Sequence, residues 1–339
     1  MYRNHKQRDI AQRTLPLLLI LLFLLLLSSC TIQEKQITSQ ISSQPSFETI
    51  KIAYKPTAHY LSVFVAKDQG FFQQEGLVPE LIEFDTSNLA MDALLSDQVD
   101  VARGGLLLQL KVESEKPGVL TTFLVNKQTT ENFVDYLLVH KESAINSFAD
   151  LKGKKVGTAA GLIETTMIKN ILKANGVAET DIQVIEMKPT LLPQALEAKQ
   201  VDAVYIYEPE ANIALERGFA KALAEHPSET YLLNPWIGGG VYIKTSLIER
   251  NPQKAKKIMR AFKKAGQFIA DHPDEAKEIL LQYVPLKVDK NKLHALPEFD
   301  VSDSAIRKAA QMHADFLLEK GVLQKRVDVD DLFYEQPIE

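Results

Sequence analysis

Residues 148–170 read FADLKGKKVGTAAGLIETTMIKN, and this stretch decides the fold. A short apolar strand at 155–158 leads into a turn of small residues that is bracketed by Gly157 and Gly161. A strand that passes through such a turn into a helix leaves free backbone N–H groups pointing at one spot, which predicts half of a small-molecule site. The alternative is an ordinary βα unit with a glycine turn. The helix ends at Asn175-Gly176 and carries apolar side chains at helical spacing, namely Ile163, Met167, Ile168 and Ile171.

The same strand–helix alternation extends on both sides of this stretch. Residues 49–125 read as βαβαβαβ, which is typical of a mainly parallel α/β sheet. The pattern restarts at 155, and a later helix of the series ends at Gly218, so a second α/β unit spans roughly 141–236. The segment after it holds one strand at 241–244 and helices at 252–271, 274–283 and 302–319. This is too little chain for a third sheet, so we expect the segment to return to the first unit.

These units predict two lobes joined by two crossings, near 136–141 and 236–244. Lobe one comprises 48–140 plus 237–339, and lobe two comprises 141–236. A cleft between lobes is a preferred place for ligands, and loops at the carboxyl ends of parallel strands supply the contacts.

The composition of the chain limits the classes of function that it can have. The chain has 339 residues, 45% of them hydrophobic and 24% charged, with a formal charge of -5, which predicts a globular protein of about two domains. No basic patch or zinc pattern indicates nucleic-acid binding. The sequence lacks G-x-S-x-G, H-E-x-x-H, phosphate-loop and G-x-G-x-x-G motifs, so we expect a protein that is not an enzyme and holds no metal or cofactor.

The N-terminus is a targeting segment. A basic start precedes an apolar run at 15–27, which is shorter than the roughly 20 residues of a transmembrane helix. The run ends in Leu-Ser-Ser-Cys30, which resembles the bacterial lipobox and predicts a signal peptide at 1–29 and lipidation of Cys30, the only cysteine. The segment 30–47 is rich in Gln and Ser and reads as a flexible tether. The expected location is therefore the cell envelope, lipid-anchored and facing the periplasm or the extracellular side.

Three motifs in this order resemble solute-binding proteins of ABC importers. They are His59-Tyr60 with VAKDQGFFQQEGL at 65–77, DLKGKKVG at 150–157 and VDAVYIYEP at 201–209. The nearest subgroup binds taurine, alkanesulfonates, nitrate and thiamine-pyrimidine precursors. The resemblance implies a two-lobed periplasmic-binding-protein fold of the two-crossing type (type II) that closes by a hinge on its ligand.

The resemblance also implies partners. A monomer would capture a small organic solute and deliver it to an ABC permease in the cytoplasmic membrane, while Cys30 holds it to the bilayer. One enzyme branch of the family uses a cysteine-rich iron motif, and this chain has no cysteine left for it. The alternative is a lipoprotein that uses the same fold to sense a ligand and signal to a membrane partner.

Five loops should face the cleft: 55–60, 85–88 and 103–105 from lobe one, and 158–166 and 207–210 from lobe two. Trp236, the only tryptophan, could stack on a ligand or pack at the hinge. The threonines beside helix starts could bind a ligand or merely cap the helices. The candidate ligand-binding residues are His59, Tyr60, Thr86, Ser87, Arg103, Thr158, Glu164, Thr165, Tyr207, Glu208 and Trp236.

The ligand's charge stays open at this stage. Glu164 at a helix start would repel a sulfonate or nitrate and favour a neutral or cationic nitrogen heterocycle. Arg103 suits a carboxylate or sulfonate, unless it pairs with Glu164 or Asp85. The basic face of the helix at 252–271 could dock a permease or anionic lipid, or could simply be solvated.

Overall fold

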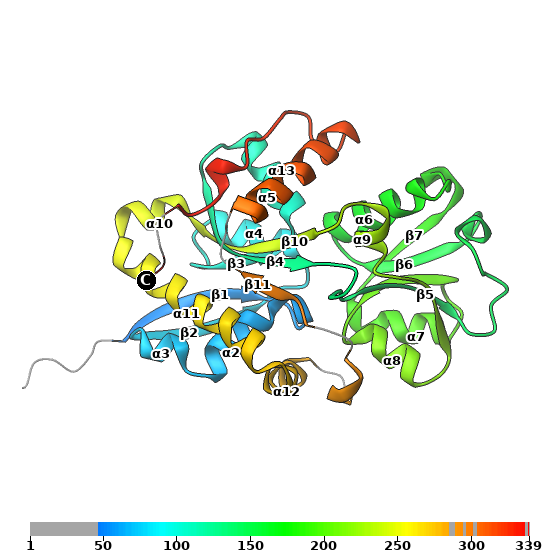
Figure 1. Cartoon of the computed structure of the whole chain (residues 1–339), viewed down its shortest axis with the longest axis horizontal. Helices are drawn as coiled ribbons and strands as arrows, with labels where there is room; N and C mark the ends of the chain where they lie inside the picture. Colours follow the sequence, from blue (N-terminus) through cyan, green and yellow to red (C-terminus); the bar gives the residue numbers. More distant parts are fainter. Residues whose placement is uncertain (1–46, 285–288, 294–295, 301–303, 336–337, 339) are drawn as a thin grey trace, which may run out of the picture. The chain divides into compact units, whose positions relative to one another are not determined.

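The structure is a computed structural model and describes residues 47–284, 289–293, 296–300, 304–335 and 338. The predicted signal peptide, Cys30 and the tether up to residue 46 lie outside the described residues. Glu48–Glu339 forms one compact unit, and within it the elements divide into two lobes (Figure 1). The predicted α/β fold class with two lobes is confirmed.

Lobe one contains a two-stranded and a four-stranded sheet. β1 (Glu48–Tyr54) pairs in parallel with β2 (Leu77–Glu83). The strand pairs of the second sheet are antiparallel, because strands from outside 49–125 join it. Ile52 of β1, however, bridges in parallel to Val101, so the prediction of a mainly parallel sheet holds in part for this lobe. Its strand order is β11 (Glu298–Asp300), β4 (Leu120–Gln128), β10 (Trp236–Lys244) and β3 (Ala102–Gly104).

The helices of lobe one bury their apolar faces. The apolar side of α11 (Pro252–Asp271) packs against α2 (Leu61–Asp68), and Phe64 of α2 stacks on Tyr283 of α12 (Pro273–Tyr283) at a centroid distance of 4.3 Å. The other helices here are α3 (Phe71–Gln74), α4 (Ser87–Leu95), α5 (Leu106–Glu115), α10 (Thr245–Arg250) and α13 (Ser304–Glu319).

The basic face of α11 is partly neutralised within the chain. Arg260 and Lys264 both pair with Glu75, and Lys254 pairs with Glu48 and Asp100. These contacts support the interpretation that this face is solvated and locally paired. Among the described residues, no helix combines the length and apolar character needed to cross a bilayer.

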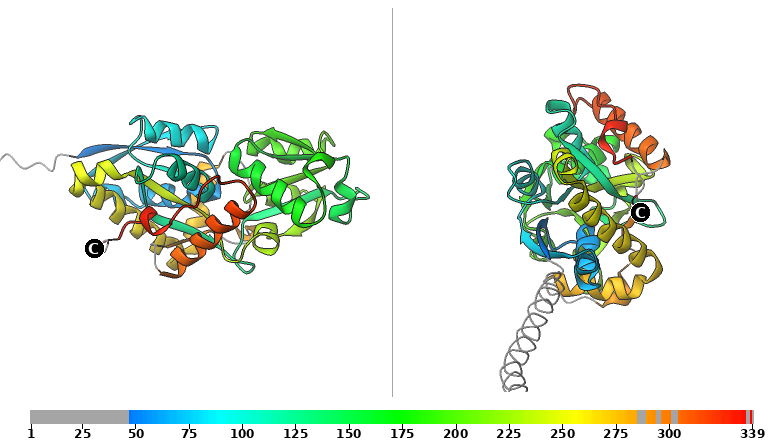
Figure 2. Two further views of the ribbon diagram at one scale, coloured as in Figure 1. Left: turned by 90° about the horizontal axis from the view of Figure 1, so that it is seen from above. Right: turned by 90° about the vertical axis from the view of Figure 1, so that its left-hand side faces the viewer.

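Lobe two is built on one five-stranded sheet. Its order is β7 (Gln183–Met187), β6 (Lys155–Ala159), β8 (Ala203–Tyr207), β5 (Asp135–His140) and β9 (Ala220–Glu225). The first three strands are parallel, and β5 and β9 are antiparallel additions. Its helices are α6 (Leu162–Ala174), α7 (Leu192–Glu197), α8 (Glu210–Glu216) and α9 (Pro227–Tyr231). Figure 2 shows the green segment that carries α6–α9 to one side of the other elements.

The first crossing lies upstream of its predicted position. The sequence division placed 136–140 at the end of lobe one, but β5 pairs with β8 and β9 of the second sheet. The chain therefore crosses between Gln128 and Asp135, and it returns between Tyr231 and Trp236. An apolar strand does not reveal which sheet it joins, because either interior would bury it.

The strand that returns to lobe one begins earlier than the sequence predicts. β10 includes the glycines at 238–240 and carries a bulge between Ile237 and Gly239. Gly239 has φ +143°, and a Cβ there would lie 2.0 Å from the Gly104 carbonyl oxygen of β3. Glycine is needed here because the two backbones approach too closely for a side chain.

Candidate functional site

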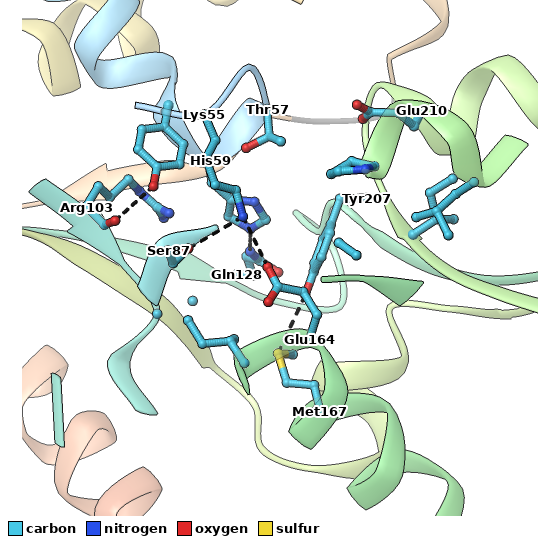
Figure 3. A pocket seen from close by; sticks show the side chains of 18 of the residues that line it. Lys55, Thr57, His59, Ser87, Arg103, Gln128, Glu164, Met167, Tyr207 and Glu210 are labelled. Atoms are coloured by element: carbon cyan, nitrogen blue, oxygen red, sulfur yellow. Dashed lines mark hydrogen bonds and ion pairs between the residues drawn. The ribbon is translucent and has the colours of Figure 1, made fainter. Parts of the chain in front are cut away.

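A cavity between the lobes is lined by side chains from both (Figure 3). It lies where β1, β6 and β8 end, and carboxyl ends of parallel strands commonly bring binding loops together. The enclosed space is about 40 Å³. One water needs about 10–15 Å³ of such space, so this conformation holds only a few waters and no organic solute of ordinary size.

Seven of the eleven predicted ligand-binding residues line this cavity: His59, Tyr60, Ser87, Arg103, Glu164, Tyr207 and Trp236. They come from the five predicted loops and from β10. Five further polar or adaptable side chains of the lining were absent from the predicted set: Lys55, Thr57, Gln128, Met167 and Glu210. Lys55 and Glu210 stand at the outer ends of two predicted loops, so their position was the signal that could have identified them.

The remaining four predicted residues do not line the cavity. Thr86 caps α4, where its hydroxyl oxygen accepts a hydrogen bond from the Leu89 N–H at 3.2 Å. Thr165 donates to the Glu186 carboxylate at 2.7 Å. Thr158 is fully buried within β6, and the Glu208 carboxylate accepts a bond from the Tyr136 hydroxyl at 3.4 Å.

An ion pair connects the lobes inside the cavity. The Lys55 ammonium, from the loop after β1, lies 3.4 Å from the Glu164 carboxylate of α6 and 3.5 Å from the Ser87 hydroxyl. Both charged side chains are less than one-tenth exposed. Burial opposes the charge on Lys55, but the Glu164 carboxylate outweighs it and raises the pKa of Lys55 above its usual value. The two charges therefore support each other only while the lobes are close.

Glu164 reaches the cavity because of the turn that precedes it. Gly161 caps α6 with φ +137°, and a Cβ there would lie 2.9 Å from a Glu164 carboxylate oxygen. Glycine thus leaves room for the carboxylate to fold back over the helix start. A carboxylate in the first turn also interacts favourably with the helix dipole.

Arg103 is fixed by its own lobe. Its guanidinium donates to the Asn126 side-chain oxygen and lies 5.4 Å from the centre of the Tyr60 ring. The Tyr60 hydroxyl donates to the Arg103 carbonyl oxygen at 2.9 Å. The Nε of Arg103 is buried and has no hydrogen-bond partner among the described residues.

The two partners considered for Arg103 from the sequence are engaged elsewhere. Glu164 bonds Lys55, and Asp85 pairs at 2.8 Å with Lys188, which follows β7 of lobe two. The Asp85–Lys188 pair is largely exposed, so it adds a second but solvated contact between the lobes.

Aromatic side chains form one wall of the cavity. The His59 and Tyr207 rings meet edge to face at 4.8 Å, and the His59 Nε2 lies 3.2 Å from the Gln128 side-chain nitrogen. Burial, with the charges of Arg103 and Lys55, holds the pKa of His59 well below its usual value, so the ring is neutral at pH 7. Trp236 lines the cavity, and its ring packs at 4.4 Å on that of His313 of α13.

Glu210 adds a second carboxyl group from lobe two. It is 1% exposed, and its Oε1 has no hydrogen-bond partner within the described part of the chain. Burial, with a smaller contribution from the Glu208 carboxylate, raises the pKa of Glu210 to about 8. At pH 7 the group is mostly protonated and can both donate and accept a hydrogen bond. No cluster of three or more His, Cys, Asp or Glu side chains in the described residues is placed to hold a metal ion.

A family model described as "NMT1/THI5 like" matches residues 57–276. The chain belongs to this family. It is 26% identical over 277 residues to a putative aliphatic sulfonates-binding protein of Bacillus subtilis, covering 80% of this chain and 81% of the relative. It is 26% identical over 300 residues to a putative thiamine biosynthesis protein of Haemophilus influenzae, covering 83% and 90%.

A third relative is named as an enzyme. The chain is 23% identical over 247 residues to the 4-amino-5-hydroxymethyl-2-methylpyrimidine phosphate synthase THI5 of Saccharomyces cerevisiae, covering 70% of this chain and 71% of the relative.

Solved structures support the fold. The periplasmic aliphatic sulphonate binding protein SsuA of Escherichia coli matches with a TM-score of 0.67 and 19% identity, covering 86% of this chain and 93% of its own. The alkanesulfonate-binding protein SsuA of Xanthomonas axonopodis pv. citri, bound to MOPS, matches with a TM-score of 0.68 and 21% identity, covering 86% and 99%. This family member therefore has the periplasmic-binding-protein fold.

Proposed function

We propose that the chain is the solute-binding protein of an ABC importer and that it performs no catalysis. The observation that carries the proposal is the buried Lys55–Glu164 pair, which closes a cavity lined by both lobes. A site divided between two lobes, which the described residues join at two crossings, can open and close around a solute. The binding proteins among its relatives and structural neighbours support the same role.

The proposal includes the solute and its destination. The solute is a small nitrogen heterocycle, such as a thiamine-pyrimidine precursor, or an aliphatic sulfonate, and the partner that receives it is a membrane permease. The relatives named for sulfonate binding and for thiamine biosynthesis support these two classes. The ligand-binding residues are the seven predicted residues of the lining together with Lys55, Gln128 and Glu210.

Binding is tested with the full chain purified in a mild detergent. The protein is incubated with an extract of small bacterial metabolites, separated from unbound solutes, and analysed by mass spectrometry after denaturation. We expect retention of one solute or a narrow set from the two classes, and a rise in the unfolding temperature when that solute is added back. Retention of no solute would contradict the proposed function.

The anchor is part of the proposal and has its own test. If Cys30 carries the lipid, the full chain sediments with membranes after expression in bacteria. The variant Cys30→Ala should be released into the soluble fraction of the envelope, with its unfolding temperature unchanged. Membrane association of the variant equal to that of the native chain would show that the lipoprotein assignment is wrong.

A further inference from the structure

The two lobes present opposite chemistry to the cavity. Lobe one contributes two cations, Lys55 and Arg103, whereas lobe two contributes two carboxyl groups, Glu164 and Glu210. Figure 3 shows the Lys55 side chain pointing across the cavity toward Glu164, with Arg103 to the left of Lys55. The solvent has little access to any of these groups.

A solute that enters between the lobes must separate Lys55 from Glu164. The enclosed space of about 40 Å³ leaves no other room, and the pair lies across it with only 3.4 Å between nitrogen and oxygen. When the lobes close again on the solute, both charges are returned to a buried position. A buried charge that has lost its partner is strongly destabilising, so the solute itself must supply a new partner to each.

The polar groups of the cavity that lack a partner define which hydrogen-bonding groups the solute must carry. On lobe one, the displaced Lys55 ammonium and the unpartnered Arg103 Nε are hydrogen-bond donors. On lobe two, the displaced Glu164 carboxylate is an acceptor, and the buried Glu210 Oε1 is also without a partner among the described residues. The chemistry required of the solute is therefore an acceptor at one end and a nitrogen donor at the other.

We propose that the solute is amphoteric: it directs an anionic or ring-nitrogen acceptor at Lys55 and Arg103, and an amino or ammonium group at Glu164, and so takes the place of the Lys55–Glu164 ion pair. This inference rests on the proposed function and narrows it. Simple alkanesulfonates and other anions without an amino group are excluded as preferred ligands, because they would leave Glu164 buried and unpaired.

The experiment uses matched pairs of small solutes that differ by one amino group. Two such pairs are taurine with ethanesulfonate, and 4-amino-2-methylpyrimidine with 2-methylpyrimidine. Retention of each by the full chain in detergent is measured by mass spectrometry, and affinities follow by calorimetry. We expect the amino member of at least one pair to bind at least about tenfold more tightly than its partner, since a hydrogen bond to a buried carboxylate is gained.

Two variants then assign the preference to the ion pair. Glu164→Gln should weaken the amino member about tenfold or more and change its partner less than about twofold. Lys55→Gln should weaken both members, because both keep the acceptor. The matched control is Glu179→Gln, which removes an exposed carboxylate that follows α6 in the chain. This variant should change the affinity for neither member. Unfolding temperatures verify that each variant folds.

The outcomes separate this inference from the proposed function. Equal or tighter binding of the members without an amino group would overturn the inference and leave solute binding intact. Equal losses for both members in Glu164→Gln would also overturn it, because Glu164 would then stabilise closure only. If no member of any pair is retained but the metabolite extract yields a solute without an amino donor, the inference is likewise wrong. Retention of nothing from either source contradicts both proposals.

Discussion

Contacts inside lobe one and contacts across the cleft are made by similar residues, but they depend differently on the position of the lobes. Arg103 and Lys55 are both buried cations of the same wall. Arg103 is held by Asn126 and Tyr60 of its own lobe, whereas Lys55 is paired with Glu164 of the other. Opening the cleft leaves the contacts of Arg103 intact but breaks the Lys55–Glu164 ion pair.

Two glycines show the same difference between a contact within lobe one and a contact across the cleft, here through steric limits. Gly239 is closed in by the Gly104 backbone of the adjacent strand in lobe one. Gly105 is closed in by the Ile163 side chain of lobe two, whose Cδ1 lies 2.5 Å from the position of a Cβ. A contact of the first kind should act on folding, and a contact of the second kind should act on closure and therefore on binding.

The largest effect is expected for Gly239→Ala. Its φ of +143° is unfavourable for alanine, and the added Cβ would meet a backbone oxygen that cannot rotate away. We expect a loss of at least about 3 kcal/mol in the free energy of unfolding, measured by denaturant titration. The matched control is Gly118→Ala, where φ is +73° but nothing lies within 4 Å, so only the backbone strain of about 1 kcal/mol applies. Equal losses for both variants would contradict the role given to the β3–β10 approach.

The next largest effect is expected at Glu210, whose contribution to stability depends on pH. Its pKa in the folded chain is raised to about 8, whereas an unfolded glutamate titrates near 4.5. Between these values the folded state keeps a proton that the unfolded state releases, so the stability contributed by Glu210 is fully present below about pH 4.5 and is lost as the pH rises toward 8.

We expect Glu210→Gln to be the more stable protein at pH 8 by about 1–2 kcal/mol and to show a smaller advantage at pH 5, because the amide needs no proton. Denaturant titrations at several pH values measure the difference. Burial also raises the pKa of Glu229, to about 10, so a decline with pH remains in the variant but is shallower. Parallel pH profiles of the two proteins would show that Glu210 is not the titrating group.

The sequence alone predicts the secondary-structure elements of the two lobes only in part. Strands and helices with strong patterns were located well: the strand predicted at 155–158 is β6, and the helices predicted at 252–271 and 274–283 are α11 and α12. β9 was missed because its sequence, AKALAE, has a low strand propensity, and its antiparallel pairing with β5 makes it a strand. Local pattern cannot reveal such a partner.

Prediction of the candidate site from the sequence is limited in the same way. Loops at strand ends were predicted, and seven predicted side chains meet in the cavity. The partners of these side chains were not predicted: Glu164 and Asp85 were considered as alternative partners of Arg103, but its guanidinium bonds Asn126. Lys55 and Glu164 are 109 positions apart and no periodicity links them, so their contact follows from the fold alone. Thr86 makes the local contact that polar side chains at helix starts often make, whereas Thr165 bonds Glu186 on β7.

The smallest of the expected effects tests a contact across the cleft. In Gly105→Ala the backbone is not strained, since its φ is -69°, but the new Cβ would overlap Ile163 when the lobes are closed. Ile163 can shift only partly, so we expect the closed state to lose about 1 kcal/mol and the affinity for the retained solute to fall about fivefold to tenfold. Calorimetry measures the affinity, and unfolding without ligand should change little because the lobes can separate.

A second substitution decides whether closure is the cause. Ile163→Val removes the Cδ1 atom that a Cβ at position 105 would meet at 2.5 Å. Combined with Gly105→Ala, it should restore most of the affinity, although Ile163→Val alone should weaken binding slightly through lost packing. An effect of Gly105→Ala that persists unchanged in the double variant would place the damage inside lobe one. Gly105 would then belong with Gly239 among the contacts that act on folding, and the separation of the two kinds of contact would fail at this position.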